Sequence, residues 1–278
     1  HEFEQMDRYG EVRRDWLEAS GLSELGLEFI WIGNVAGSFG NHTYIEGLLK
    51  ANQLGLRTAV KPVLLLPQNT RLRNPALFSY FEPHLCVFQD HELITSLRRL
   101  EALLTLPLGL CLPLNEGCPY IDFAANRLET ERIKQGLDSA FFTLSDHHRQ
   151  IGAQVLKQLG LPEDAWYVIL HVREPGYRGE TLMNTRDNFR NANPLDYLKA
   201  IEAVTTAGGW VFRMGDLSMT PLPKMPHVID YALDEIRCDW MDIFLGATCR
   251  FCIGTSSGYY VAPSMFGKPV LLTNCPQF

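Results

Sequence analysis

YVILHVR, residues 167–173, is the stretch of the chain that decides the fold. Four strand-forming residues come first, and the turn signal EPG follows at 174–176. The pattern predicts a buried strand that ends with two cationic side chains, His171 and Arg173, on one face, because strand side chains alternate. A guanidinium at the carboxyl end of a parallel strand suits a phosphate, and the imidazole adds a donor. On these two residues alone, a strand-end histidine and an ordinary surface arginine remain the alternative.

Composition limits the classes of protein to which the chain belongs. Its 278 residues are 46% hydrophobic and 21% charged, which is typical of a globular protein with one large or two ordinary domains. The net charge of −7 argues against nucleic-acid binding through a broad cationic surface. No apolar run approaches the roughly 18 residues of a membrane span, and no signal peptide is evident. We therefore expect a cytoplasmic protein, and the ends at His1 and Phe278 suggest a segment of a longer chain.

The cysteines and acidic pairs do not predict a metal site or another cofactor. The seven cysteines are scattered at positions 86, 111, 118, 238, 249, 252 and 275, which fits reduced thiols better than a disulfide framework. Cys249 and Cys252 form a C-x-x-C, but no second pair follows at zinc spacing. Asp239 and Asp242 are too far apart for a D-x-D element and indicate the start of a helix.

Strand and helix patterns alternate in both halves of the chain, which is typical of parallel sheets with helical crossovers. Strands are predicted at 27–32, 58–66, 85–88, 167–173, 210–213, 227–230, 250–253 and 270–273, and helices at 44–54, 74–82, 92–104, 145–159, 194–206, 240–248 and 260–266. An irregular stretch at 107–127 ends a first domain or leads into a hinge. The polar segment 174–193 is predicted to be a mobile loop over the site.

The first half contains a glycine-rich loop, GNVAGSFGNHT at 33–43, between a strand and a helix. Its amides and the helix N-terminus can face an anion or a sugar. The loop matches neither a Walker A sequence nor G-x-G-x-x-G. A loop that only needs positive φ at its glycines is the alternative.

Four strands of the second half each end in residues that can hold a nucleotide. These residues are His171 and Arg173; Arg213, Gly215 and Asp216; Asp230; and Thr255, Ser256, Ser257 and Gly258. Because the carboxyl ends of parallel strands meet at one edge, we expect them to converge. Each has a structural alternative: Thr255 and Ser256 cap a helix, Asp230 starts a turn, or Arg213 pairs with Asp216.

Several of these stretches resemble a known family. They are HVREPGY at 171–177, RNANPLDYLKAI at 190–201, VFRMGD at 211–216, VIDYA at 228–232 and GTSSGYYVAPSMFGKPVLLTN at 254–274, with a weaker resemblance over 27–95. Together they resemble a bacterial glycosyltransferase family related to the fucosyltransferase-type GT-B enzymes, which carry an H-x-R element on a strand end. The resemblance implies an α/β, GT-B-like fold with two Rossmann-like parallel-sheet domains facing a cleft. Residues 1–140 would form the acceptor-side domain, and residues 141–278 the nucleotide-sugar donor-binding domain.

The resemblance also implies an activity. A transferase of the hexosyl or deoxyhexosyl type would move a sugar from a nucleotide-sugar donor to a glycan or other hydroxyl acceptor in polysaccharide biosynthesis, without a metal and with a preference for inversion. Arg173 would hold the diphosphate with His171 in support, Asp230 would bind the nucleoside, and Ser256 and Ser257 would contact phosphate. Glu174 stands where those relatives usually carry a second arginine, so neither GDP nor fucose follows from the resemblance.

An inverting transferase needs a base for the acceptor hydroxyl, and His42, Glu46 and Glu174 are the candidates. His42 is preferred, although an imidazole at this position can merely cap a helix. Two other functions remain open. One is a nucleotide-sugar epimerase or hydrolase of the same architecture, and the other is a non-catalytic nucleotide- or carbohydrate-binding module.

Overall fold

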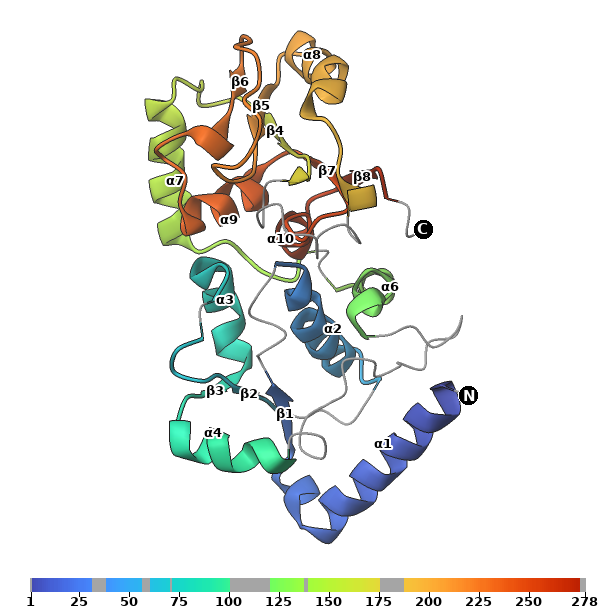
Figure 1. The fold of residues 1–278 in the computed structure, drawn as a ribbon. Coiled ribbons are helices and arrows are strands. Elements are labelled where there is room, and N and C mark those ends of the chain that lie inside the picture. The colour runs from blue at the N-terminus through green and yellow to red at the C-terminus, as the bar shows by residue number, and fades with distance from the viewer. Residues whose placement is uncertain are drawn as a thin grey trace. The chain divides into compact units, whose positions relative to one another are not determined.

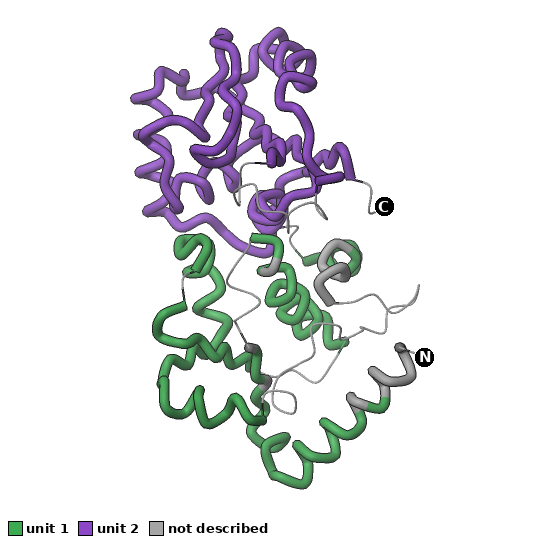
Figure 2. The backbone as a smooth tube through the Cα atoms, viewed as in Figure 1, with its two compact units in different colours: residues 1–139 green, residues 140–278 purple. Residues whose placement is uncertain are grey.

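The computed structural model describes residues 2–31, 39–56, 61–70, 72–100, 121–137, 140–175 and 188–275. The chain divides into two compact units, residues 1–139 and residues 140–278 (Figure 2). Their assignment to acceptor and donor remains a prediction. In the described part of the chain, no helix is both long enough and apolar enough to cross a membrane.

In the described residues of unit 1, a parallel sheet of three strands has the order β1-β2-β3. The strands are β1 (Leu27–Trp31), β2 (Lys61–Leu65) and β3 (Cys86–Phe88), and the helices are α1 (Glu2–Ala19), α2 (His42–Gln53), α3 (Pro75–Phe81), α4 (His91–Leu97) and α6 (Ile121–Lys134), with short 3-10 turns η1 (Leu22–Leu25), η3 (Phe39–Asn41), η4 (Glu82–His84) and η5 (Arg98–Leu100). Val63 and Leu65, on one face of β2, pack against Ile94 of α4. Alternate residues of this central strand, which is buried on both faces, thus hold one helix on the sheet.

Helices α2 and α6 pack against each other through buried charges. Lys50 Nζ lies 2.6 Å from Glu46 Oε1 and 2.7 Å from Glu129 Oε2. Helix α6 begins at Ile121, so the predicted irregular stretch 107–127 is wrong over its last seven residues, and 107–120 lies outside the described residues. The helix there is stabilised by contacts with α2, which the local sequence does not reveal.

Unit 2 is built on a parallel sheet of five strands in the order β6-β5-β4-β7-β8 (Figure 1). The strands are β4 (Tyr167–His171), β5 (Trp210–Arg213), β6 (Val228–Ile229), β7 (Cys252–Thr255) and β8 (Val270–Thr273), and the helices are α7 (Asp146–Gln158), α8 (Leu198–Thr206), α9 (Asp239–Thr248) and α10 (Val261–Met265), with 3-10 turns η8 (Pro194–Tyr197) and η9 (Tyr231–Leu233). The parallel pairing predicted for both halves is confirmed.

The central strand β4 is covered on both faces. Val168, Leu170 and Val172 pack with Ile201 and Val204 of α8. On the other face, the hydroxyl of Tyr167 donates to the Leu245 carbonyl of α9 at 3.2 Å. Figure 1 shows α8 and α9 on either side of these strands. Burial on both faces explains why the strand is a continuous apolar run.

Strand β7 differs from its prediction, 250–253, by two residues. Its register with β4 aligns Ile169 with Cys252 and His171 with Gly254, and Thr255 pairs with Thr273 of β8, so the strand continues to Thr255. Ser256 therefore begins the turn that follows the strand. Two loop predictions lie mostly outside the described residues: the glycine-rich loop over 33–38 and the mobile loop over 176–187.

Candidate functional site

The sheet of unit 2 reverses its strand order at β4. From β4 the chain builds β5 and β6 on one side, and then crosses to place β7 and β8 on the other. In open α/β sheets, ligands bind outside the carboxyl ends of the strands at such a switch point. The predicted site residues that follow β4 and β7 therefore lie where this fold places a ligand.

Arg173 follows β4 at this point and is held through both its backbone and its side chain. Its backbone N–H donates to Oγ1 of the buried Thr255 at 2.8 Å, and its carbonyl accepts from the N–H of Ala192 at 3.0 Å. Its guanidinium Nη1 donates to Oδ1 of Asn191. The side chain is half-buried. A cation oriented in this way requires little reorganisation when an anion arrives.

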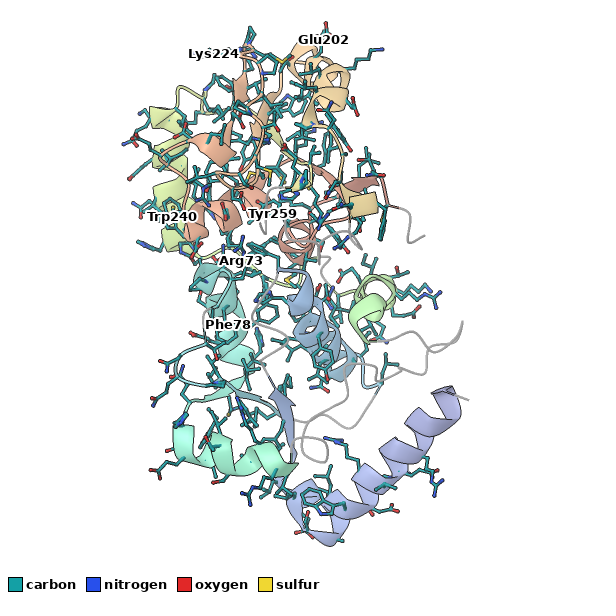
Figure 3. All side chains as sticks on the ribbon, in the orientation of Figure 1. Arg73, Phe78, Glu202, Lys224, Trp240 and Tyr259 are labelled. Atoms are coloured by element: carbon teal, nitrogen blue, oxygen red, sulfur yellow. The ribbon has the colours of Figure 1, made fainter. Side chains whose placement is uncertain are left out.

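His171, on the last residue of β4, forms a hydrogen-bonded pair with Ser257. Its Nδ1 lies 2.9 Å from Ser257 Oγ, and its ring stacks on Tyr259 with centroids 5.4 Å apart and an interplanar angle of 25° (Tyr259 is labelled in Figure 3). Burial, followed by the charge of Arg213, lowers the pKa of His171 to about 4. Of the two side chains expected to be cationic, only Arg173 is therefore charged near neutral pH.

The turn after β7 brings Ser256, Ser257 and Gly258 to the same edge of the sheet. Thr255 accepts a hydrogen bond from Arg173, and the N-terminus of α10 has no side-chain cap. Capping of that helix by Thr255 is therefore not its observed role. The hydroxyl of Tyr259 donates to the carbonyl of Asp242 at 2.8 Å and so fixes the turn to α9.

Arg213, which ends β5, is engaged in ion pairs within the protein, and its role in donor binding remains a prediction. Its side chain is 0% exposed. Nη1 donates to Asp230 Oδ1 at 2.7 Å, while Nη2 donates to Glu174 Oε1 and to the Thr220 carbonyl, each at 2.7 Å. The structural alternative for Arg213 was an ion pair with Asp216; its partners are instead Asp230 and Glu174.

Asp230 and Glu174 have both carboxylate oxygens engaged within the protein. The second oxygen of Asp230 accepts from the Leu222 N–H, and that of Glu174 from the Thr220 N–H, both at 2.9 Å. Glu174 is buried, and the side chain of Asp230 is 23% exposed. The roles of Asp230 in nucleoside binding and of Glu174 as a base remain predictions, and neither carboxylate has an oxygen without a hydrogen bond.

Gly215 and Asp216 follow β5 in a tight turn. Gly215 has a φ of 151°, and a Cβ there would lie 2.7 Å from Cγ of Met219. Oδ1 of Asp216 accepts from the N–H and the hydroxyl of Ser218, at 2.9 and 2.5 Å. The carboxylate is half-buried. The turn therefore presents an oriented acid beside the end of β4.

The two base candidates in unit 1, His42 and Glu46, are both buried. His42 is 1% exposed, its Nδ1 lies 3.2 Å from the Phe39 carbonyl, and its ring stacks on Phe81 with centroids 5.7 Å apart. Glu46 is buried beside Lys50, and the dominant effect of burial raises its pKa. These contacts agree with the capping role considered for His42, while its role as a base remains a prediction.

Within the described part of the chain, no three His, Cys, Asp or Glu side chains are grouped as metal ligands would be. Cys249 and Cys252 are buried free thiols, and burial raises the pKa of Cys249 to about 12. They have the environment of core residues.

Asn191 belongs to the candidate site, although sequence reasoning assigned it no role. Its side chain accepts from Arg173, and its carbonyl accepts from Nδ2 of Asn274 at 2.9 Å. Asn191 thus links the end of β4 to the residue after β8. The RNAN run at 190–193 was part of the family resemblance, and this was the available signal.

The chain was compared with known protein families, curated proteins and solved structures. No protein-family model and no curated protein matches the chain. The ADP-heptose LPS heptosyltransferase II of E. coli is similar over 88% of this chain and 84% of its own, with 12% identity and a TM-score of 0.52. A family 9 glycosyltransferase from Veillonella parvula is similar over 88% and 79%, with 10% identity and a TM-score of 0.52.

The fold is GT-B. The prediction of an α/β fold of this type is confirmed by these structures and by the parallel sheets. The more specific relation to fucosyltransferase-type enzymes finds no support in them. At such low identity the likeness establishes the fold, and the activity must be argued from the site.

Proposed function

We propose that the chain is a glycosyltransferase that moves a sugar from a nucleoside-diphosphate sugar to a hydroxyl acceptor, with unit 2 binding the donor. The observation that carries the proposal is the fixed position of Arg173 at the switch point of the sheet, held by Thr255 and Asn191. The GT-B fold of two known glycosyltransferases supports it. The name of the E. coli enzyme makes an ADP-sugar one donor to test.

The chemistry follows from the charge of the leaving group. Glycosyl transfer passes through an oxocarbenium-like state while negative charge grows on the diphosphate. Arg173 would stabilise that charge, and the hydroxyls and amides of 256–258 would add neutral donors. An oriented donor of this kind contributes about 10²–10³-fold to the rate. In this proposal side chains supply the positive charge that a metal supplies elsewhere.

The neutral imidazole of His171 would act through hydrogen bonding. Its pKa of about 4 leaves it uncharged near neutral pH, and it orients the hydroxyl of Ser257 from 2.9 Å. His171 and Ser257 would therefore both remain uncharged, and neither would need to gain or lose a proton while negative charge grows on the diphosphate. Inversion at the anomeric carbon, which the family resemblance favours, remains part of the proposal and is tested by the anomer of the product.

Thermal unfolding with nucleotides is the first test. ADP, GDP, UDP, dTDP and CMP would be added separately, without metal and then with EDTA. A ligand at a hundred times its dissociation constant stabilises the native state by about 2.7 kcal/mol. We expect one diphosphate to raise the unfolding temperature, EDTA to leave that shift intact, and Arg173→Ala to abolish it.

Arg250→Ala is the matched control for Arg173→Ala. Arg250 precedes β7, at the opposite edge of the sheet, with its guanidinium 4.7 Å from the Trp166 ring centroid. The control removes the same charge, and we expect it to keep the nucleotide shift. Turnover assays with and without glycan acceptors complete the test. Binding without turnover would indicate a binding module, and release of sugar without acceptor dependence would indicate a hydrolase.

A further inference from the structure

Asp216 and Asp230 follow neighbouring strands of unit 2 but differ in their surroundings. Both oxygens of Asp230 accept hydrogen bonds from within the protein, one from Arg213 and one from Leu222. Asp216 uses only Oδ1, for Ser218, and among the described residues its Oδ2 has no hydrogen-bond partner. Asp216 is thus an acid with one oxygen fixed in the protein and one available.

The backbone keeps Asp216 beside the site. The N–H of Met214 donates to the Leu170 carbonyl at 2.8 Å, so the chain stays paired with β4 beyond the end of β5. Neighbouring strands lie roughly 4.8 Å apart. The charge of Asp216 acts on the imidazole of His171 and opposes the effect of Arg213 on its pKa. The acid therefore lies within reach of a ligand held at Arg173.

The strand order gives Asp216 a specific place. Taken in chain order from β4, the sheet reads 3-2-1-4-5, which is the order of dinucleotide-binding folds. In those folds the pyrophosphate lies at the end of the first strand, and an acid roughly 20 residues further on accepts the ribose 2′-hydroxyl. Here Arg173 follows the first strand and Asp216 follows the second, 43 positions later, so the match is in strand position and not in sequence spacing.

We propose that Asp216 accepts a hydrogen bond from the ribose 2′-hydroxyl of the donor, so that the donor is a ribonucleoside-diphosphate sugar and not a 2′-deoxy one. The proposal rests on the proposed function and narrows its substrate class. Asp230, the acid that the family resemblance assigned to the nucleoside, forms an ion pair with Arg213, and its nucleoside-binding role remains a prediction.

The test pairs a change in the protein with a change in the ligand. Binding of ADP, GDP and UDP and of their 2′-deoxy forms is measured by calorimetry for the wild type and Asp216→Asn. Asparagine keeps an oxygen for Ser218 and removes the available one. For the tightest ribonucleotide, we expect the wild type to bind the 2′-deoxy form about 10- to 100-fold more weakly, and Asp216→Asn to lose a similar factor for the ribonucleotide alone.

Two controls separate this outcome from a general loss of the site. Inorganic pyrophosphate, which has no ribose, should bind Asp216→Asn as it binds the wild type and should be lost in Arg173→Ala. Asp230→Asn should lower the unfolding temperature but keep the preference for ribose, because its carboxylate pairs with Arg213.

The outcomes that contradict the inference differ from those that contradict the proposed function. If nucleotides bind and Asp216→Asn keeps the ribose preference, the inference is wrong and the proposed function stands. Equal binding of the ribose and 2′-deoxy forms by the wild type would contradict the inference in the same way. If the wild type binds no nucleotide and transfers no sugar, the proposed function is wrong and the inference with it.

Discussion

The two sides of β4 use similar side chains in opposite ways. On the β7 side, Arg173 is half-buried and held by the neutral partners Thr255 and Asn191. On the β5 side, Arg213 is fully buried and paired with the carboxylates of Glu174 and Asp230. A half-buried cation can reach a ligand, whereas the charge of a fully buried cation between two carboxylates is engaged within the fold. The role of an arginine at a strand end therefore depends more on its burial and its partners than on the residue type.

Removing Arg213 should produce the largest effect. Arg213→Met leaves the carboxylates of Glu174 and Asp230 without their cation, and breaking a buried pair costs about 3–5 kcal/mol. Arg173→Met removes a half-buried side chain that bonds to Asn191, so we expect a smaller cost than for Arg213→Met. Hydrogen exchange of the β4 and β5 amides in urea reports the free energy of opening for unit 2 alone.

A variant that removes all three charges keeps this prediction testable if Arg213→Met does not fold. Arg213→Met combined with Glu174→Met and Asp230→Leu leaves no unpaired buried charge, and such replacements often restore stability. We expect the triple variant to be more stable than Arg213→Met. Equal stability of Arg213→Met and Arg173→Met would show that the two sides of β4 do not differ as described.

A smaller effect distinguishes two threonines that are partners across β7 and β8. Thr255 and Thr273 are aligned in the sheet, but Thr255 Oγ1 accepts from Arg173, while the Thr273 hydroxyl bonds to Gly254 and Tyr197. Thr255→Val leaves the N–H of Arg173 without its acceptor, at about 1–3 kcal/mol, and shifts the guanidinium. We expect Thr255→Val to lower both the unfolding temperature and diphosphate affinity, and Thr273→Val to lower the temperature alone. If the two variants bind diphosphate equally, Thr255 does not position Arg173.

The sequence predicted a strand or helix correctly where its local pattern matches the element that forms in the folded protein. Strands β5 and β8 lie where short runs of apolar residues predicted them. Strand β7 is shifted because its register is set by β4, and α6 was missed because it is stabilised by α2. Neither partner is visible in a local window of sequence.

Only part of the candidate site could be predicted from the sequence. That the side chains of Arg173 and Glu174 point in different directions could have been inferred, since successive residues of an extended chain point to opposite faces. The burial of Arg213 could not, because its partners Glu174 and Asp230 lie 39 and 17 positions away. The support of Asn191 for Arg173 spans 18 positions and depends on the same long-range geometry.

The smallest effect concerns the charge of His171, which lies close to both arginines and senses both. Burial lowers its pKa to about 4, and Arg213 and Arg173 add to the lowering while Asp216 opposes it. Resonances of its ring carbons should therefore stay constant from pH 8 to about pH 5 and change around pH 4. We expect Arg173→Met to raise this pKa and Asp216→Asn to lower it.

The lowered pKa of His171 also determines whether its contribution to the free energy of unfolding rises or falls with pH. Because the folded-state pKa lies below the unfolded value of about 6.5, the unfolded chain takes up the proton first as the pH falls. The contribution of His171 to stability is complete above about pH 6.5 and is lost progressively down to about pH 4. A titration near pH 6.5 in the folded protein would instead make His171 a second cation beside Arg173. Diphosphate affinity would then rise on acidification, because a protonated His171 and Arg173 would both attract the diphosphate. The β7 side of β4 would then carry two cations, and the β5 side one.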